Sequence, residues 1–324
     1  MREADVMMFV RQWGSGAPVI ALHPLGLDSS GFEGFGRVLA RRGLRTIAAD
    51  LPGFGRSIAP DEPLRPAVLA EPVIELARSL EQPPIVLGIS LGGRVAIEAA
   101  LTAPDAFRAV IPIAPGLPWL RYRTVSPGGL SWITPEMLSA MMPFERIWPV
   151  LRWLAGVLES TPYVRDDEIA QSAARFVYFL SCPATRAAFF SAGRELAVDP
   201  PLGPDGFWTR LPDLDVPKVF VWGERDLLIT PRFAKAVERS LPGAFQVLMP
   251  CVGHWLNGAH HRCLAEAVAG LVATLHDPAR AAADDTEPVH RIGGVGLHHR
   301  PCLVDDAATP ELAEVAVGGI RHAG

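Results

Sequence analysis

The sequence has few cysteines and none of the spacings that would bring them together. Its four cysteines are scattered through 324 residues without a C-x-x-C pair, so the chain predicts neither a zinc ribbon nor a small disulfide-rich scaffold. His298, His299 and Cys302 lie close together near the C-terminus, but Pro301 interrupts them and a fourth ligand is missing. Because a structural zinc site normally has four protein ligands, no metal site is predicted.

The sequence also lacks a secretion signal, a membrane span and a basic block. The apolar run Val6–Val10 is too short for a secretory h-region, and no apolar stretch approaches the length that crosses a bilayer. A net charge of −5 without a basic cluster gives no reason to expect nucleic acid as a partner. We therefore expect a cytoplasmic protein with reduced thiols and a sizeable core. The sequence leaves the oligomeric state open.

The clearest positive signal is a serine placed between glycines. Ser90 stands between Gly88 and Gly92. Gly88 comes directly after the apolar run Ile85–Leu87, and a helical pattern follows from Arg94. This arrangement is typical of a nucleophile elbow, a strained turn from strand to helix in which any side chain at the glycine positions would collide with the turn. The helix N-terminus also favours developing negative charge. A Gly-Ser turn that caps an ordinary helix is the alternative, so the interpretation depends on a matching acid and base.

An acid and a base follow in the required order. Asp226 comes just after the strand-like run Lys218–Trp222, and His254 comes just after Phe245–Met249. A serine is a poor nucleophile until an imidazole takes its proton, and the imidazole needs a carboxylate to hold its tautomer and orientation. Taken singly, Asp226 could be a helix N-cap and His254 an ordinary loop histidine. Their common position after strands predicts that Ser90, Asp226 and His254 form a catalytic triad.

With these residues the chain resembles the α/β-hydrolases that carry a single cap, and two further motifs support the resemblance. After the apolar run Val19–Leu22 comes His23–Gly26, at the place of the family's oxyanion loop. Ala49–Ser57 matches the family's D-x-P-G-x-G-x-S turn, which Asp50 is expected to anchor by hydrogen bonds. The resemblance covers about residues 8–277.

The resemblance implies that the backbone N–H groups of Leu25 and Leu91 form an oxyanion hole. Family members usually have glycine after the loop histidine, where this chain has Pro24. Proline has no N–H, but the expected donor is the following residue, so the hole is retained. A plain His-Pro turn is the alternative interpretation of this loop.

Strand and helix patterns alternate along the chain, which predicts an α/β fold with a doubly wound, mostly parallel sheet. The alternation stops after about Ile113 and resumes at Lys218. We therefore expect an α/β-hydrolase core over 1–115 and 212–277, an inserted helical cap over 116–211, and a loosely ordered extension over 278–324. A short helix is expected near Pro310–Val317.

Aromatic and methionine side chains of the expected cap are candidates for contact with a substrate. Five of the eight tryptophans fall within 116–211, and they could simply form the cap's own small core. In the sharper interpretation, some of them build an apolar pocket over Ser90. The substrate-binding candidates, which include the neighbour of His254, are Trp119, Trp132, Met141, Trp148 and Trp255.

The serine at position 90 also narrows the expected reaction. The related epoxide hydrolases and haloalkane dehalogenases need an aspartate nucleophile, so the resemblance favours hydrolysis of a small carboxylic ester without a cofactor. Hydrolysis of carbon–carbon bonds in ring-cleavage products is an alternative: that group shares the Gly-His-Trp seen at Gly253–Trp255, but it commonly has Asn where Ile89 stands. Cofactor-free perhydrolase activity and a non-catalytic role as a small-molecule receptor also remain open.

Overall fold

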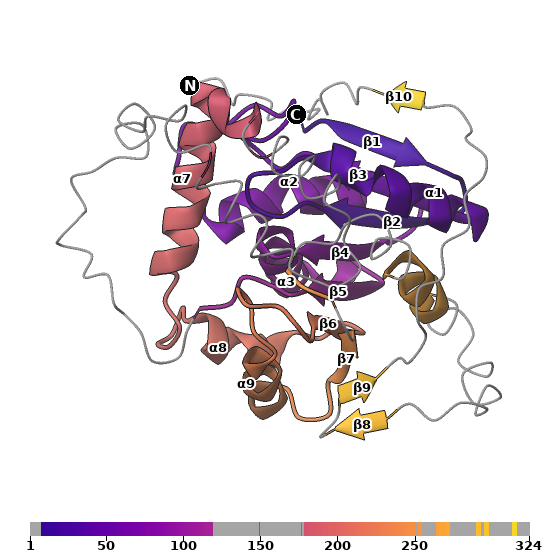
Figure 1. The fold of residues 1–324 in the computed structure, drawn as a ribbon, viewed down its shortest axis with the longest axis vertical. Coiled ribbons are helices and arrows are strands. Elements are labelled where there is room, and N and C mark those ends of the chain that lie inside the picture. Colours follow the sequence, from indigo (N-terminus) through magenta and orange to yellow (C-terminus); the bar gives the residue numbers. More distant parts are fainter. Residues whose placement is uncertain are drawn as a thin grey trace.

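The protein is built around one mostly parallel sheet, as predicted. The computed structural model describes residues 8–118, 149, 176, 178–249, 252–254, 264–272, 290–292, 295–297 and 313–315. The strand order is β10-β1-β3-β2-β4-β5-β6-β7-β9-β8 (Figure 1). Every pairing from β3 through β2, β4, β5 and β6 to β7 is parallel, and β1 pairs antiparallel with β3. The strands are β1 Val10–Trp13, β2 Ala17–Leu22, β3 Leu44–Ala49, β4 Ile85–Ile89, β5 Ala109–Ile113, β6 Val219–Gly223, β7 Phe245–Met249, β8 His290–Ile292, β9 Val295–Leu297 and β10 Ala313–Val315.

Helices cover both faces of the sheet and give the core two layers. Alternate side chains of a strand reach opposite faces: Val86 of β4 joins the apolar cluster that contains α2, α3 and α9, whereas its neighbours Ile85 and Leu87 join the cluster that contains α1 and the helix at 264–272. Central strands buried on both faces are expected to be continuously apolar. The helices are η1 Ser29–Phe32, α1 Glu33–Arg41, α2 Pro66–Arg78, α3 Leu91–Thr102, η2 Pro104–Ala106, α7 Pro183–Val198, α8 Phe207–Arg210, η3 Leu211–Asp213 and α9 Arg232–Ser240.

Three short strands from segment 278–324 join the two edges of the sheet. β9 pairs parallel with β7, β8 pairs with β9, and β10 pairs antiparallel with β1 at the far edge. The segment therefore contacts the core at these strands, and the expectation that the rest of it is loosely ordered stays a prediction. The expected short helix near 310–317 is wrong at Ala313–Val315, where backbone pairing with β1 outweighs the local helical preference.

Two features considered from the sequence are not found within the described ranges. No described helix has the length and apolarity that a membrane span requires. Nor do His, Cys, Asp and Glu side chains there form a group of three that could hold a metal ion.

Candidate active site

Ser90 occupies a strained turn between β4 and α3, with the geometry that the sequence predicts for an elbow. Its φ of 53° and ψ of −111° are unusual for a residue with a side chain. Three backbone hydrogen bonds hold this conformation. The Ser90 N–H donates to the Ile113 carbonyl at 2.9 Å, and the Ser90 carbonyl accepts from the N–H groups of Arg94 at 3.0 Å and Gly116 at 2.9 Å. The end of β5 and the first turn of α3 thus fix the serine.

The flanking glycines are required by close backbone approach. A Cβ on Gly88 would collide with the carbonyl of Gly92, and one on Gly92 would collide with the carbonyl of Leu22 at the end of β2. The turn therefore packs against the strand that leads into the oxyanion loop. This explains in steric terms the Gly-x-Ser-x-Gly pattern seen in the sequence.

Asp226 and His254 lie on the loops that follow β6 and β7, and their side chains meet. His254 Nδ1 is 2.8 Å from Asp226 Oδ2, and both residues are buried. The second carboxylate oxygen of Asp226 accepts the backbone N–H groups of Leu228 at 2.9 Å and Ile229 at 2.7 Å. An ionised carboxylate accepts hydrogen bonds only, so the proton between the pair belongs on His254 Nδ1. That tautomer leaves Nε2 free of a proton and able to act as a base.

The loop after β2 is held by a fully buried histidine. His23 Nδ1 donates to the Pro24 carbonyl at 2.9 Å, and His23 Nε2 accepts the Leu51 N–H at 2.9 Å. Burial lowers the pKa of His23, against smaller opposing effects of the Pro24 hydrogen bond and of Asp50 and Asp28. Its ring is therefore neutral near pH 7, and it ties the expected oxyanion loop to the loop after β3.

The N–H groups of Leu25 and Leu91 are the donors that the sequence predicts for an oxyanion. Among the loop and turn hydrogen bonds of the described residues, neither group has a backbone acceptor. Leu91 is the first residue of α3, where helical N–H groups have no partner within the helix. Leu25 precedes Gly26, whose φ of 79° needs glycine. Pro24, which has no N–H, does not occupy either donor position.

Asp50 anchors the turn after β3, as the sequence predicts. Its Oδ1 accepts the Ser29 N–H at 2.7 Å, and its Oδ2 accepts the Arg56 N–H at 2.8 Å. The Ser57 hydroxyl donates to the Asp50 carbonyl at 2.6 Å. This side chain thus links the segment that follows the oxyanion loop to the glycine-rich turn.

Helix α7 covers the loops around Ser90, and sequence reasoning did not single out its residues. A Cβ on Gly26 would lie 3.1 Å from the ring of Phe189 in α7 and 2.6 Å from the ring of Phe176, which precedes this helix. A Cβ on Gly116 would lie 3.6 Å from Leu196 of α7 and 3.7 Å from the Ser90 carbonyl. Phe189 and Leu196 are seven positions apart, which places them on one face of the helix. Apolar residues at this spacing in 183–198 were the signal available in the sequence.

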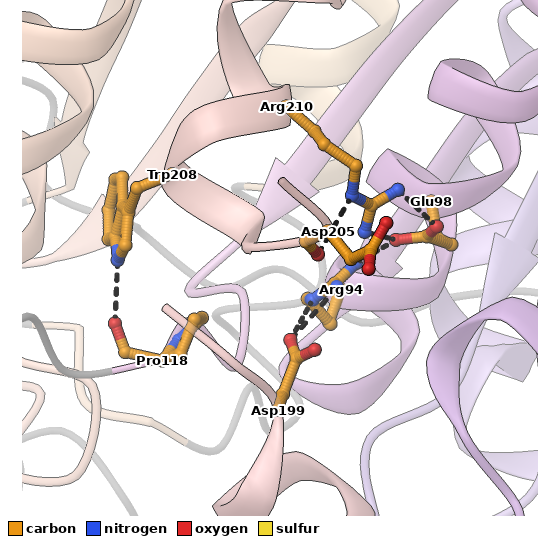
Figure 2. Close-up of polar contacts among 7 residues, drawn as sticks. All are labelled: Arg94, Glu98, Pro118, Asp199, Asp205, Trp208 and Arg210. Atoms are coloured by element: carbon orange, nitrogen blue, oxygen red, sulfur yellow. Dashed lines mark hydrogen bonds and ion pairs between the residues drawn. The ribbon is translucent and has the colours of Figure 1, made fainter. Parts of the chain in front are cut away.

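The substrate-binding candidates from the sequence lie outside the described residues: Trp119, Trp132, Met141, Trp148 and Trp255. One other tryptophan of the expected cap, Trp208, is described. It is buried, and its Nε1 donates to the Pro118 carbonyl at 2.8 Å (Figure 2). Trp208 therefore packs in the apolar cluster of the sheet that contains α2, α3 and α9. Whether the other tryptophans form a small core of the cap stays a prediction.

Comparison with known proteins identifies the family of this chain. Residues 19–267 match the sequence profile of the Alpha/beta hydrolase family. The chain belongs to this family. The match spans the expected oxyanion loop, the elbow at Ser90 and both loops that carry Asp226 and His254.

Similar proteins include several hydrolases. The pimeloyl-[acyl-carrier protein] methyl ester esterase of Aeromonas salmonicida is 29% identical over 254 residues, which are 76% of this chain and 91% of that protein. The 2-(acetamidomethylene)succinate hydrolase of Mesorhizobium japonicum is 26% identical over 82% of this chain and 92% of that protein. A thermophilic esterase from Thermogutta terrifontis has the same fold, with a TM-score of 0.61 and 19% identity over 83% of this chain and 94% of its own. The chain is accordingly a hydrolase of the α/β-hydrolase family.

Proposed function

We propose that this protein hydrolyses small, largely apolar carboxylic esters through an acyl-enzyme intermediate on Ser90. The observation that carries the proposal is the hydrogen bond between buried Asp226 and His254. Their loops follow β6 and β7, and the strained Ser90 turn follows β4, so all three lie at the carboxyl ends of parallel strands. This combination supplies a nucleophile, a base and an orienting carboxylate, and it needs no cofactor.

In the proposed first step, Ser90 Oγ attacks the ester carbonyl carbon while His254 Nε2 takes its proton. Asp226 holds the imidazole in the required tautomer and stabilises the imidazolium that forms. The N–H groups of Leu25 and Leu91 are the proposed donors to the oxyanion, and loss of one such donor typically costs about 3–4 kcal/mol of transition-state stabilisation.

In the proposed second step, His254 gives its proton to the departing alcohol and then activates a water molecule. The water attacks the acyl carbon, the acid leaves, and the proton returns to Ser90. Both steps use the same donors and the same base, so one geometry serves acylation and deacylation.

The preference for an apolar substrate follows from the side chains near the expected oxyanion loop. Phe176, Phe189 and Leu196 come from α7 and the residues before it, and Leu25 approaches the same helix near Gly193. Apolar side chains of this kind line most small-molecule sites. Relatives named as esterases support an ester as the substrate. The remaining proposed lining residues are Trp119, Trp132, Met141, Trp148 and Trp255, from a cap over 116–211 and from the residue after His254. A cytoplasmic location is part of the proposal, since the scattered cysteines fit a reducing compartment.

The test is turnover of p-nitrophenyl acyl esters of increasing chain length by the purified full chain, with Ser90→Ala as the matched control. We expect turnover by the wild type and a loss of at least about 10³-fold in the variant. Equal turnover by both proteins would overturn the proposal.

Three further assays on the purified full chain separate the alternatives. Hydrolysis of a vinylogous diketone without hydrolysis of esters would identify carbon–carbon bond cleavage. Hydrogen peroxide-dependent peracid formation that exceeds hydrolysis would identify a perhydrolase. Saturable binding of an ester without turnover would identify a receptor on a hydrolase fold. Each of these outcomes rejects ester hydrolysis as the main activity.

A further inference from the structure

Four charged side chains, two of them buried, form a cluster outside the candidate active site. Arg94 and Glu98 come from α3, Asp199 follows the end of α7, and Arg210 ends α8 (Figure 2). Arg94 Nη1 donates to Glu98 at 2.6 Å, and its Nε and Nη2 donate to Asp199 Oδ2 at 3.1 and 2.9 Å. Arg210 donates two hydrogen bonds to the carboxylate of Glu98, at 2.7 and 3.0 Å. Two positive and two negative charges therefore share one network.

The cluster is fully paired in spite of its burial. The side chains of Arg94 and Glu98 are 1% and 5% exposed, and the Arg94 guanidinium also lies 4.5 Å from the centre of the Phe207 ring. Burial works to raise the pKa of Glu98, but hydrogen bonds and charge from Arg210 and Arg94 outweigh it and keep this pKa below its ordinary value. Apolar residues could fill such a space at equal or better stability, so stability alone does not account for the cluster.

The position of Arg94 connects the cluster to the nucleophile. Arg94 lies four residues after Ser90, and its own N–H donates to the Ser90 carbonyl. Its side chain reaches Asp199, which is 105 positions away in sequence and caps the C-terminal end of α7. One residue therefore contacts both the turn of the proposed nucleophile and the end of the helix that covers the site.

Helix α7 crosses three loops of the site between its two ends. Ala188 lies against Gly53, Gly193 faces Leu25, and Leu196 lies against Gly116. Most of these contacts are with apolar side chains or backbone. The Ser191 hydroxyl of α7 also accepts the Leu64 N–H at 3.1 Å, but no charged group takes part in that contact. A helix can slide or rotate over an apolar surface with small energetic change, whereas a charged hydrogen-bonded pair fixes one arrangement.

We infer that Arg94 and Asp199 form a positioning pair that sets the place of α7 over the expected oxyanion loop. The pair thereby determines how the acyl chain of the substrate fits between Leu25 and the apolar face of α7. This inference rests on the proposed function for its substrate, and it assigns to Asp199 a role in substrate specificity without contact with the reacting atoms.

Arg210 of the same network provides a matched control for Asp199. Asp199→Ala removes the contact with the end of α7 but leaves Arg94 paired with Glu98. Arg210→Ala removes the two hydrogen bonds to Glu98 and one from Arg210 Nε to the Asp205 carbonyl. It also leaves the Arg94–Glu98 pair, and the substitution lies in α8. Arg210 is 31% exposed and Asp199 is 11% exposed, so each variant loses a partner near the edge of the cluster.

The experiment compares kcat and KM for short-chain and long-chain p-nitrophenyl esters in the wild type and both variants. For Asp199→Ala we expect KM for the long-chain ester to rise roughly 10-fold, because a small displacement of a substrate-positioning element is enough for an effect of this size. The kcat for the short-chain ester should stay within about twofold, since the variant leaves the triad intact. Arg210→Ala should lower Tm by about as much as Asp199→Ala does, but it should leave the ratio of the KM values for the long-chain and short-chain esters unchanged. Asp199→Asn keeps the size of the side chain, so it should raise KM for the long-chain ester by less than Asp199→Ala does.

Hydrogen exchange of peptides from 183–198 gives a readout that does not depend on activity. We expect faster exchange in Asp199→Ala than in the wild type, and no change in Arg210→Ala. If Asp199→Ala does not fold, Asp199→Asn is used for both measurements. Unchanged exchange and an unchanged KM ratio in the soluble Asp199 variant would overturn the inference. Faster exchange together with absence of any ester turnover in the wild type would instead reject the proposed function and leave the positioning of α7 standing.

Discussion

His254 Nδ1 lies 2.8 Å from Asp226 Oδ2, while Asp226 Oδ1 accepts two backbone N–H groups from its own loop. The carboxylate is therefore oriented by the loop after β6, and it in turn orients the imidazole on the loop after β7. Two loops that follow neighbouring parallel strands supply a base with a defined tautomer.

Asp226→Asn should preserve the fold and reduce activity strongly. The amide oxygen of asparagine can still accept the N–H groups of Leu228 and Ile229, but its NH₂ group favours the wrong tautomer of His254. By analogy with the serine protease triad, kcat should fall by about 10⁴-fold. Ester turnover measures the loss, and the Tm checks folding. A folded variant that retains more than about a tenth of wild-type kcat would contradict the role of Asp226.

Gly88→Ala should destabilise the protein because the new Cβ would collide with the backbone of Gly92 in the elbow. We expect a loss of about 3 kcal/mol in the free energy of unfolding, measured by urea denaturation. Gly34→Ala is the matched control: this position is in α1 and has nothing within 4 Å. The control should be neutral or gain up to about 1 kcal/mol from better helix propensity. Similar results for both variants would mean that the elbow does not need a glycine at position 88.

His23 should make the protein less stable as the pH falls. Burial lowers its pKa in the folded state below the ordinary value of 6.5, so the unfolded chain binds the proton more readily. The stabilising contribution of the neutral ring is therefore fully present above pH 6.5 and is lost as the pH falls below that value.

The comparison for His23 is His23→Gln, which does not titrate and carries an acceptor for the Leu51 N–H. Unfolding free energies of both proteins should be measured at about pH 7.5 and about pH 5.5. The wild type should lose more stability across this interval than the variant, because other titrating groups are common to both. Parallel losses in the two proteins would show that His23 is not held neutral by burial.

Phe189→Ala should change the preference for acyl chain length. If the α7 face lines the acyl site, kcat/KM for a long-chain ester should fall about 10-fold, while that for an acetyl ester should change little. Phe245→Ala provides a control at an exposed phenylalanine at the start of β7. If Phe189→Ala instead lowered kcat/KM equally for esters of all chain lengths, Phe189 would lie outside the acyl site.

The sequence was sufficient to predict strands β1 to β7 of the sheet and the turn that carries Ser90. Strands such as Ile85–Ile89 are buried on both faces and are therefore continuously apolar. The elbow at Ser90 needs glycines for a steric reason that is local in sequence. The turn anchored by Asp50 was predicted from the resemblance of Ala49–Ser57 to a family motif, and two of its hydrogen-bond partners, Arg56 and Ser57, lie within that motif.

The contacts of α7 and of the C-terminal strands with distant segments could not be predicted. The spacing of Phe189 and Leu196 indicates one apolar face of a helix, but it does not say which loops that face covers. The Arg94–Asp199 pair joins residues 105 positions apart, and no local pattern distinguishes it from ordinary surface charges. The short strand Ala313–Val315 pairs with β1 at the other end of the chain, so its conformation depends on a partner that the local sequence does not reveal.

Reaction with a fluorophosphonate probe tests the central claim most directly. The probe forms a stable adduct with a serine only where a neighbouring base activates it. Intact mass and peptide mapping of the labelled protein should show one adduct per chain, located on Ser90, and no adduct in Ser90→Ala. His254→Ala should label at least about 10³-fold more slowly, because the serine then has no base. Equal labelling of the wild type and Ser90→Ala, or an adduct at another residue, would contradict the assignment of Ser90 as the nucleophile.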